Sequence, residues 1–184
     1  MRKPCLVLIS LLIWGAAFAA AQPVPGKRFE FGTSLNFVSL KTQNDEPAQG
    51  ALNIPVRFGW FFWKGFELEP EFTISFPIGA VTATTELLFL GNLTYNFKTA
   101  KPLVPFIGAG AGVGSGIMLL GGVEGKGTGV TVFDALCGVK ALFGNVIGLR
   151  AEYRFNRYSY NLILEPEPIR GTYHQVMVGL SLFF

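Results

Sequence analysis

The sequence predicts an all-β fold: an eight-stranded antiparallel up-and-down transmembrane β-barrel. Apolar and polar residues alternate along eight segments, which is the pattern of strands with two unlike faces. Short turns alternate with longer, polar connections between these segments, as in a meander whose two ends lie together. Most large apolar residues share one face of each segment, and a sheet that turns such a face to lipid must close into a barrel.

The composition limits the class of protein. The chain has 184 residues, which suits a single domain, and 50% of them are apolar and 15% charged. This is too apolar for a disordered chain. The formal net charge is +3, and Arg2 and Lys3 supply two of these charges. A basic patch dense enough for nucleic acid is therefore excluded.

Residues 1–21 are predicted to be a secretory signal peptide, and residues 22–184 the barrel domain. The signal consists of a short basic start, an apolar run and a small-residue end. An uncleaved membrane anchor is the alternative, because residues 5–21 carry no charge and are nearly long enough to span a bilayer. The small-residue end favours cleavage after Ala19 or Ala21.

The first three expected strands cover residues 29–37, 52–60 and 66–76. In the third, Glu67, Glu69 and Glu71 share one face, and large apolar residues occupy the other. A helix would mix these residues on all its faces. Pro70 predicts a local irregularity, because proline cannot donate a ladder hydrogen bond.

The fifth expected strand, residues 103–116, allows a second interpretation. Residues 102–123 are uncharged and long enough to cross a bilayer as a helix, with Gly108, Gly112 and Gly116 at the spacing of a helix-dimer motif. Glycine also fills the positions between them, and each glycine costs a helix about 1 kcal/mol relative to alanine. The strand is therefore favoured.

The other four expected strands alternate in the same way, with Leu88 and Leu90 as exceptions in the fourth; they cover residues 85–97, 130–143, 147–155 and 172–184. The connections fall into two groups. Longer or more polar ones lie near residues 41–50, 77–83, 117–129 and 159–171, and short ones near residues 62–65, 98–102 and 144–146. This predicts four loop regions at one end of the barrel and three turns at the other.

The polar face is expected to line the barrel interior, because side chains fill the space within eight strands and buried charges must be paired. Hairpin geometry places Arg57 across from Glu69 or Glu71, and Lys140 near Arg150 and Glu152. The glycines of the fifth strand are expected to make room for long side chains. The predicted ion-pair network of the lumen consists of Glu30, Arg57, Glu67, Glu69, Glu71, Lys140, Arg150, Glu152 and Arg154.

Aromatic residues near the strand ends suit the two girdles of a membrane barrel, although an ordinary soluble core would also contain rings. Towards the turns these residues are Phe29, Trp60, Phe66, Phe97 and Phe184, and towards the loops they are Phe37, Phe76 and Phe155.

The last segment resembles the recognition signal of outer-membrane barrels, because the chain ends in phenylalanine with apolar residues at every second place before it. These residues are Val176, Val178, Leu180, Leu182 and Phe184. PFIGAGAGVG (residues 105–114) and GLRAEYRF (residues 148–155) look like the fifth and seventh strands of the OmpA-like and OmpX-like small barrels of the porin family.

The resemblance implies a bacterial outer-membrane location, reached by export through the periplasm and assembly by the outer-membrane insertion machinery. It implies a lumen filled by ion pairs, with the lipid bilayer and lipopolysaccharide as partners. A monomer is expected. Unlike OmpA itself, the chain is expected to be a barrel only, without a following peptidoglycan-binding domain.

No catalytic, cofactor-binding or metal-binding residue is predicted. The glycine runs lack the spacing of nucleotide-binding loops, and one histidine with scattered acids gives no metal cluster. Removal of the signal would leave Cys137 as the only cysteine and therefore no intramolecular disulfide. Lipid A deacylase resembles the chain in strand number and uses a histidine and a serine on its outer wall. His174 is suitably placed, but Val176 stands where the serine is needed, so an enzyme is not expected.

Three functions are open at this stage. The leading one is a non-enzymatic outer-membrane protein with an envelope-structural or surface-interaction role through its loops, whose ligand is unknown. The second is a narrow porin-like conduit for small or hydrophobic solutes. The third is a soluble periplasmic lipocalin-like carrier, which would need an apolar interior.

Overall fold

The computed structural model describes residues 26–40, 49–78, 83–99, 102–120, 123–124, 128–161 and 169–184. The predicted signal peptide and most of the predicted loops lie outside the described residues. The strands are β1 (Phe29–Leu40), β2 (Gln49–Trp63), β3 (Phe66–Ile78), β4 (Ala83–Asn96), β5 (Leu103–Leu120), β6 (Val123–Glu124), β7 (Thr128–Phe143), β8 (Ile147–Asn161) and β9 (Ile169–Phe183).

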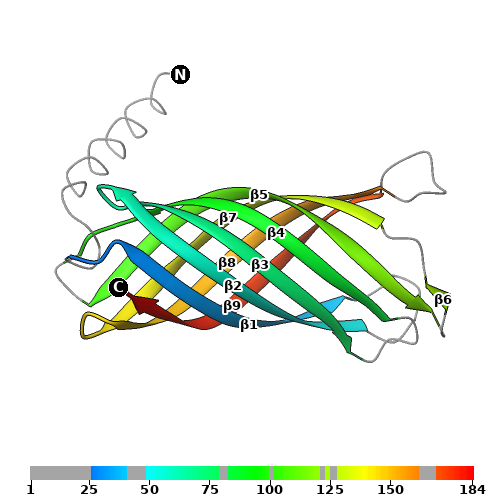
Figure 1. Ribbon diagram of the computed structural model, residues 1–184, viewed down its shortest axis with the longest axis horizontal. Helices are drawn as coiled ribbons and strands as arrows, with labels where there is room; N and C mark the ends of the chain where they lie inside the picture. Colours follow the sequence, from blue (N-terminus) through cyan, green and yellow to red (C-terminus); the bar gives the residue numbers. More distant parts are fainter. Residues whose placement is uncertain are drawn as a thin grey trace, which may run out of the picture.

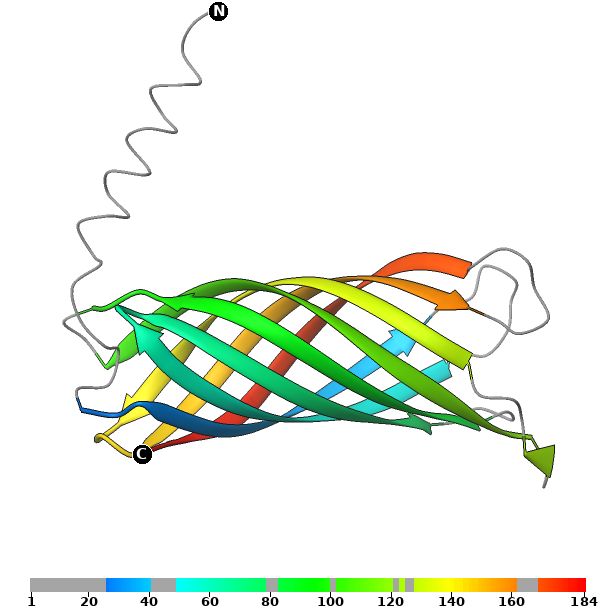
Figure 2. The ribbon, with the colours of Figure 1, turned by 45° about the horizontal axis from the view of Figure 1, so that its top comes forward.

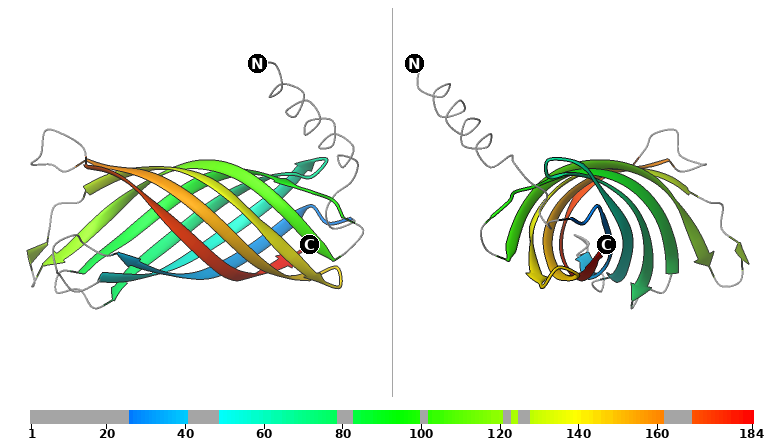
Figure 3. Two further views of the ribbon diagram at one scale, coloured as in Figure 1. Left: turned by 180° about the vertical axis from the view of Figure 1, so that it is seen from behind. Right: turned by 60° about the vertical axis from the view of Figure 1, so that its left-hand side comes forward.

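Eight of these strands form a closed antiparallel barrel, which confirms the predicted fold (Figure 1). Each long strand pairs with its neighbour in the chain, β5 pairs directly with β7, and β9 returns to pair with β1. Views from behind and towards one end show the strands curving around a common axis (Figure 3). The short strand β6 pairs only with the tip of β5, outside the ring.

Several strands extend further than predicted. The expected fifth strand ends at residue 116, whereas β5 continues to Leu120; β8 continues to Asn161, and β9 begins at Ile169. Backbone pairing persists there, with Leu119 of β5 opposite Ala83 of β4. Polarity alternation ends sooner because it marks only the part of a strand that separates two unlike surroundings. These extensions lengthen the end of the barrel opposite the carboxyl terminus (Figure 2).

The expected irregularity at Pro70 is present as a gap in the β2–β3 ladder, which passes from the pair Arg57–Glu71 to the pair Trp60–Leu68 without pairing Glu69 or Pro70. Pro70 pairs with Gly91 of β4, and the β2–β3 register is the same before and after the gap. A shift in register lies between Phe61 and Trp63, beside the turn to β3. Residues 62–63, expected in a break, therefore belong to β2.

The interior is layered along the barrel axis. Phe61 and Phe183, with Leu142 against them, form an apolar cluster near the three short turns. Leu90, Val130 and Val132, with Leu88 and Tyr158 against them, form a second cluster towards the loops. Charged and amide side chains, together with Phe106, Leu136 and Met177, fill the space between. The exceptions to alternation, Leu88 and Leu90, thus belong to the inner wall.

The outer wall is apolar. Val176 is 69% exposed, Phe133 61% and Leu35 60%, although burial of such side chains is the usual outcome of folding in water. Within the described residues there is no helix with the length and hydropathy needed to span a membrane.

Candidate functional site

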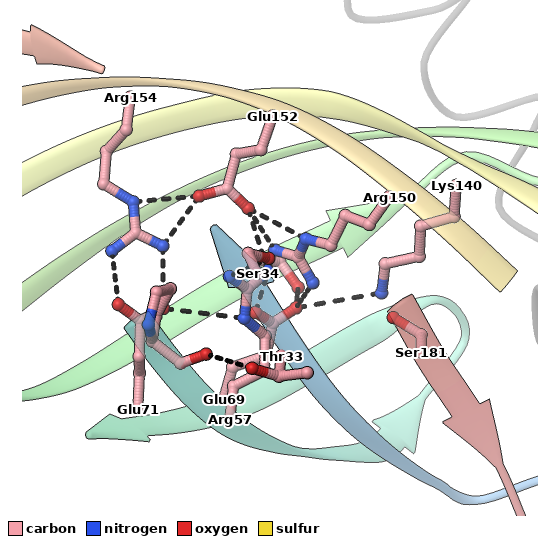
Figure 4. Close-up of polar contacts among 12 residues, drawn as sticks. Thr33, Ser34, Arg57, Glu69, Glu71, Lys140, Arg150, Glu152, Arg154 and Ser181 are labelled. Carbon is pink, nitrogen blue, oxygen red and sulfur yellow. Dashed lines mark hydrogen bonds and ion pairs between the residues drawn. The ribbon is translucent and has the colours of Figure 1, made fainter. Parts of the chain in front are cut away.

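The nine predicted lumen residues are all buried inside the barrel, and they come from five strands. They are Glu30 of β1, Arg57 of β2, Glu67, Glu69 and Glu71 of β3, Lys140 of β7, and Arg150, Glu152 and Arg154 of β8. Hydrogen bonds and ion pairs connect them across the interior (Figure 4).

Arg154 forms the part of the network nearest the loops. Its two terminal nitrogens each donate a hydrogen bond of 2.8 Å to the Glu71 carboxylate, and its Nε donates to Glu152 at 2.9 Å. Asp134 adds a carboxylate oxygen 3.2 Å from Nη1 of Arg154. A fork-to-fork pair of this kind is the strongest form of arginine–carboxylate contact.

Arg150 and Arg57 share the middle of the network. Arg150 donates two hydrogen bonds of 3.0 Å to Glu69 and one of 2.8 Å from Nε to Glu152. Arg57 donates to the same Glu152 at 3.3 Å and to the hydroxyl of Ser34 at 2.9 Å. Glu152 therefore accepts from Arg57, Arg150 and Arg154 together, which is why it can stay buried as an anion.

Lys140 forms the part nearest the turns. Its Nζ lies 2.5 Å from Glu30, 2.8 Å from Glu67 and 3.8 Å from Glu69. The hydroxyl of Ser181 completes the coordination of Glu30 with a hydrogen bond of 2.6 Å.

The contacts of Arg57 and Lys140 can be compared with the neighbours that hairpin geometry predicts for them. Arg57 lies opposite Glu71, with 3.7 Å between Nε and a carboxylate oxygen. Lys140 lies opposite Arg150 in the β7–β8 register, but its ion pairs reach β1 and β3 on other parts of the wall. Hairpin register shows which residues are adjacent, whereas the curvature of the barrel decides which ones meet across the interior.

Aromatic rings support this network in a way that was not predicted from the sequence. Lys140 lies over the rings of Phe61 and Phe106, and the guanidinium of Arg150 lies 4.2 Å from the centroid of Phe106. A cation over an aromatic face is stabilised by the ring quadrupole. A Cβ on Gly138 would lie 2.6 Å from the Phe106 ring, so this glycine makes the arrangement possible. The inward parity of Phe61 and Phe106 in the alternation is the signal that could have identified them.

The expected role of the β5 glycines is wrong in detail. A Cβ on Gly110 would overlap Asn92 and Asp134, and Cβ atoms on Gly108 and Gly112 would crowd Leu136 and Leu90. These glycines therefore make room for short polar and apolar side chains, not for the long basic ones.

The predicted aromatic residues at the turn end form part of a larger set of contacts. Phe29 lies 5.5 Å from Phe58 and 5.9 Å from Phe184, measured between ring centroids. Further contacts follow the wall over β2, β3 and β4; they join Trp60 to Phe62, Phe62 and Trp63 to Phe66, Phe66 to Tyr95, and Tyr95 to Phe97. Phe58, Phe62, Trp63 and Tyr95 were not anticipated.

Towards the loops, the predicted girdle is represented by two described side chains. Phe76 and Phe155 are exposed on the outer wall, and Phe155 lies 5.3 Å from the ring of His174. The side chain of Phe37 lies outside the described residues.

The residues of the predicted insertion signal share the outer face of β9. Val176, Val178, Leu180, Leu182 and Phe184 are all exposed. The backbone of Phe184 also exchanges hydrogen bonds with Phe29, at 3.0 Å in each direction, so the end of the chain helps to close the ring.

The outer wall also holds His174, whose Nδ1 lies 2.5 Å from the hydroxyl of Tyr153. No group of three or more His, Cys, Asp or Glu side chains that could hold a metal occurs among the described residues. The described polar residues link distant strands across the interior by ion pairs. Arg154 joins β8 to β3, and Lys140 joins β7 to β1 and β3.

Comparisons with known proteins bear on the fold. No protein-family model and no curated protein matches the chain in sequence. Among solved structures, Neisserial surface protein A matches with a TM-score of 0.67 and 14% identity over 85% of this chain and 96% of that one. The N-terminal β-barrel domain of Pseudomonas aeruginosa OprF matches with a TM-score of 0.55 and 16% identity over 86% and 98%. At these identities the likeness shows a shared fold, that of small eight-stranded outer-membrane barrels.

Proposed function

We propose that this chain, which has the fold of the small outer-membrane barrels, is a non-enzymatic integral protein of the bacterial outer membrane. Its barrel is a closed, lipid-embedded support, and its functional surface is the loop end. One observation carries the proposal: the barrel interior is occupied by paired charges between two apolar clusters, while its outer wall is apolar.

The filled interior supports this function over a conduit. Large buried side chains, among them Arg57, Arg150, Phe106 and Phe183, occupy the space that a solute would need. Moving a solute through would require breaking buried ion pairs, which costs several kcal/mol each.

The distribution of polarity supports a membrane protein over a soluble carrier. A lipocalin-like carrier holds its ligand in an apolar interior and presents a polar exterior to water. Here Glu69 and Arg150 lie inside, whereas Val176 and Phe133 lie exposed outside. Such a wall is stable in water only when lipid or detergent covers it.

The conduit can be tested with the full chain in planar lipid bilayers. We expect no stepwise conductance and no swelling of liposomes that contain the protein. The double variant Glu69→Ala/Arg150→Ala, which removes a pair together and leaves space, serves as a positive control and is expected to raise ion leakage. Conductance of the unaltered chain would contradict the proposal, and recovery of the chain in the soluble periplasmic fraction would support the carrier.

A further inference from the structure

The outer wall of the barrel carries an unusual pair of charges. Among the described strand residues whose side chains face outward, only Arg157 of β8 and Arg170 of β9 are charged. Both are exposed, and neither makes an ion pair with a described residue. Two like charges on this wall offer an anion a site with two cationic partners.

The strand register brings these arginines together with hydroxyl groups. Ser159 lies opposite Arg170 across the β8–β9 pair and opposite Thr131 across the β7–β8 pair, while Arg157 lies opposite Phe133. A hollow of about 390 Å³ lies among these residues, and it is lined by Thr131, Phe133, Arg157, Tyr158, Ser159 and Arg170. It thus combines two guanidinium groups, two aliphatic hydroxyls and two aromatic residues.

The depth of the arginines can be counted along β8. Arg157 lies ten residues beyond Ile147, where β8 begins at a short turn. A transmembrane strand needs about 9–11 residues to cross the hydrocarbon region. The arginines therefore lie at the level of the lipid head groups on the loop side. Arg157 is the next outward residue after Phe155 on β8, and Thr172 and His174 separate Arg170 from Val176 on β9.

We propose that Arg157 and Arg170, with Ser159 and Thr131, form a binding site for the phosphate group of a lipid in the loop-side leaflet. Guanidinium groups bind phosphate through paired hydrogen bonds, and hydroxyls donate further ones. A lipid is the fitting source of the phosphate, because its acyl chains would lie on the apolar wall below the arginines. Free phosphate would leave this wall uncovered.

This inference rests on the proposed place of the chain in the outer membrane. The test uses the full chain, purified from outer membranes in a neutral detergent and titrated with bisphosphorylated lipid A while bound lipid is counted by native mass spectrometry. We expect saturable binding that weakens at least tenfold in the variant Arg157→Gln/Arg170→Gln. We expect equally weak binding of dephosphorylated lipid A to the unaltered chain.

The matched control is Lys64→Gln/Lys98→Gln, which removes two exposed charges at the turn end. It should bind lipid A like the unaltered chain. Equal affinity of the arginine variant and the unaltered chain would overturn the site. Displacement of lipid A by an equal concentration of inorganic phosphate would also overturn it.

The two proposals fail separately. A chain absent from the membrane fraction would contradict the proposed function, and the titration of refolded protein in detergent would still decide the phosphate site. A chain that is inserted and folded but shows no difference between the variants would contradict the site alone.

Discussion

Glu152 shows how single residues stabilise this barrel from within. Its carboxylate accepts hydrogen bonds from Arg57, Arg150 and Arg154, which lie on β2 and β8. In a buried site, the removal of one partner leaves an opposite charge without compensation, and this costs more than the pair contributes when intact. The arginines therefore differ in importance according to how many carboxylates depend on each.

We expect Arg57→Met to lower the free energy of unfolding by roughly 3 kcal/mol, the order found for a broken buried ion pair. Arg150→Met should cost more, because Arg150 holds Glu69 with two hydrogen bonds and also contacts Glu152 and Glu30. Urea unfolding in lipid vesicles, followed by tryptophan fluorescence, measures both.

The control for these variants is Lys98→Met, which removes an exposed charge outside the strands. Exposed substitutions usually change stability by less than about 0.5 kcal/mol. An unchanged unfolding midpoint for Arg57→Met and Arg150→Met would show that the interior pairs do not stabilise the barrel.

Residue-scale prediction from the sequence reached the inner wall and the cross-strand pair of Arg57 with Glu71, but not the pairings across the interior. Alternation alone indicates that Lys140 and Glu30 face inward. Their contact joins residues that are 110 positions apart in the chain, and no local pattern encodes such a separation. The missed rings of Phe61 and Phe106 face inward by the same alternation, but an inward ring suggests a role only once the cations above it are seen.

Among the elements, the pair of β1 and β9 is the closing seam of the barrel. Six register pairs join these strands, from Glu30 with Phe183 to Leu35 with Val178, whereas fifteen join β7 and β8. Contacts beyond the ladder reinforce the seam: the Phe184 ring packs against Phe29 and Phe58, and its backbone bonds to Phe29. The last residue thus contributes to closure as well as to the predicted insertion signal.

We expect Phe184→Ala to lower the amount of folded barrel in the outer membrane several-fold. The β1–β9 ladder, the shortest in the closed barrel, would lose the aromatic contacts of Phe184 with Phe29 and Phe58. Phe143→Ala is the matched control, since this ring is 58% exposed at the same end of the barrel and lies away from the seam. Quantitative blotting of membrane fractions measures both. Equal amounts of the two variants would show that Phe184 has no special role in assembly.

Strand length is a second property of the individual elements. β5 has 18 residues and β7 has 16, more than the 9–11 or so that cross a bilayer. The excess lies at the loop end, and it would raise the loops above the membrane surface. These strands are longer than the sequence predicts, because both faces of the extensions have similar surroundings and the polarity no longer alternates.

The whole molecule reverses the usual distribution of polarity between inside and outside. Ring closure pairs the strand edges with one another, and this permits a sheet in hydrocarbon. Few backbone N–H and C=O groups in such a barrel are left unpaired, so detergent has little access to the hydrogen bonds that hold the strands together.

We therefore expect the full chain to migrate differently on a denaturing gel with and without boiling, because the folded barrel resists the detergent until it is heated. The same sample, precipitated and redissolved in urea before loading, is the unfolded control. Identical mobility of the unboiled and boiled samples would contradict a closed barrel in the membrane.

The sequence by itself determined the fold class, the number of barrel strands and the direction in which most residues of the predicted strands point. These follow from a period of two, which is a local property that neighbouring residues define. Only the tertiary structure decided which charges meet across the interior, that apolar clusters cover both sides of the charged interior, and that Arg157 and Arg170 lie together on the outer wall. Those relations depend on register and curvature around the closed ring, so they join residues that are distant in the chain.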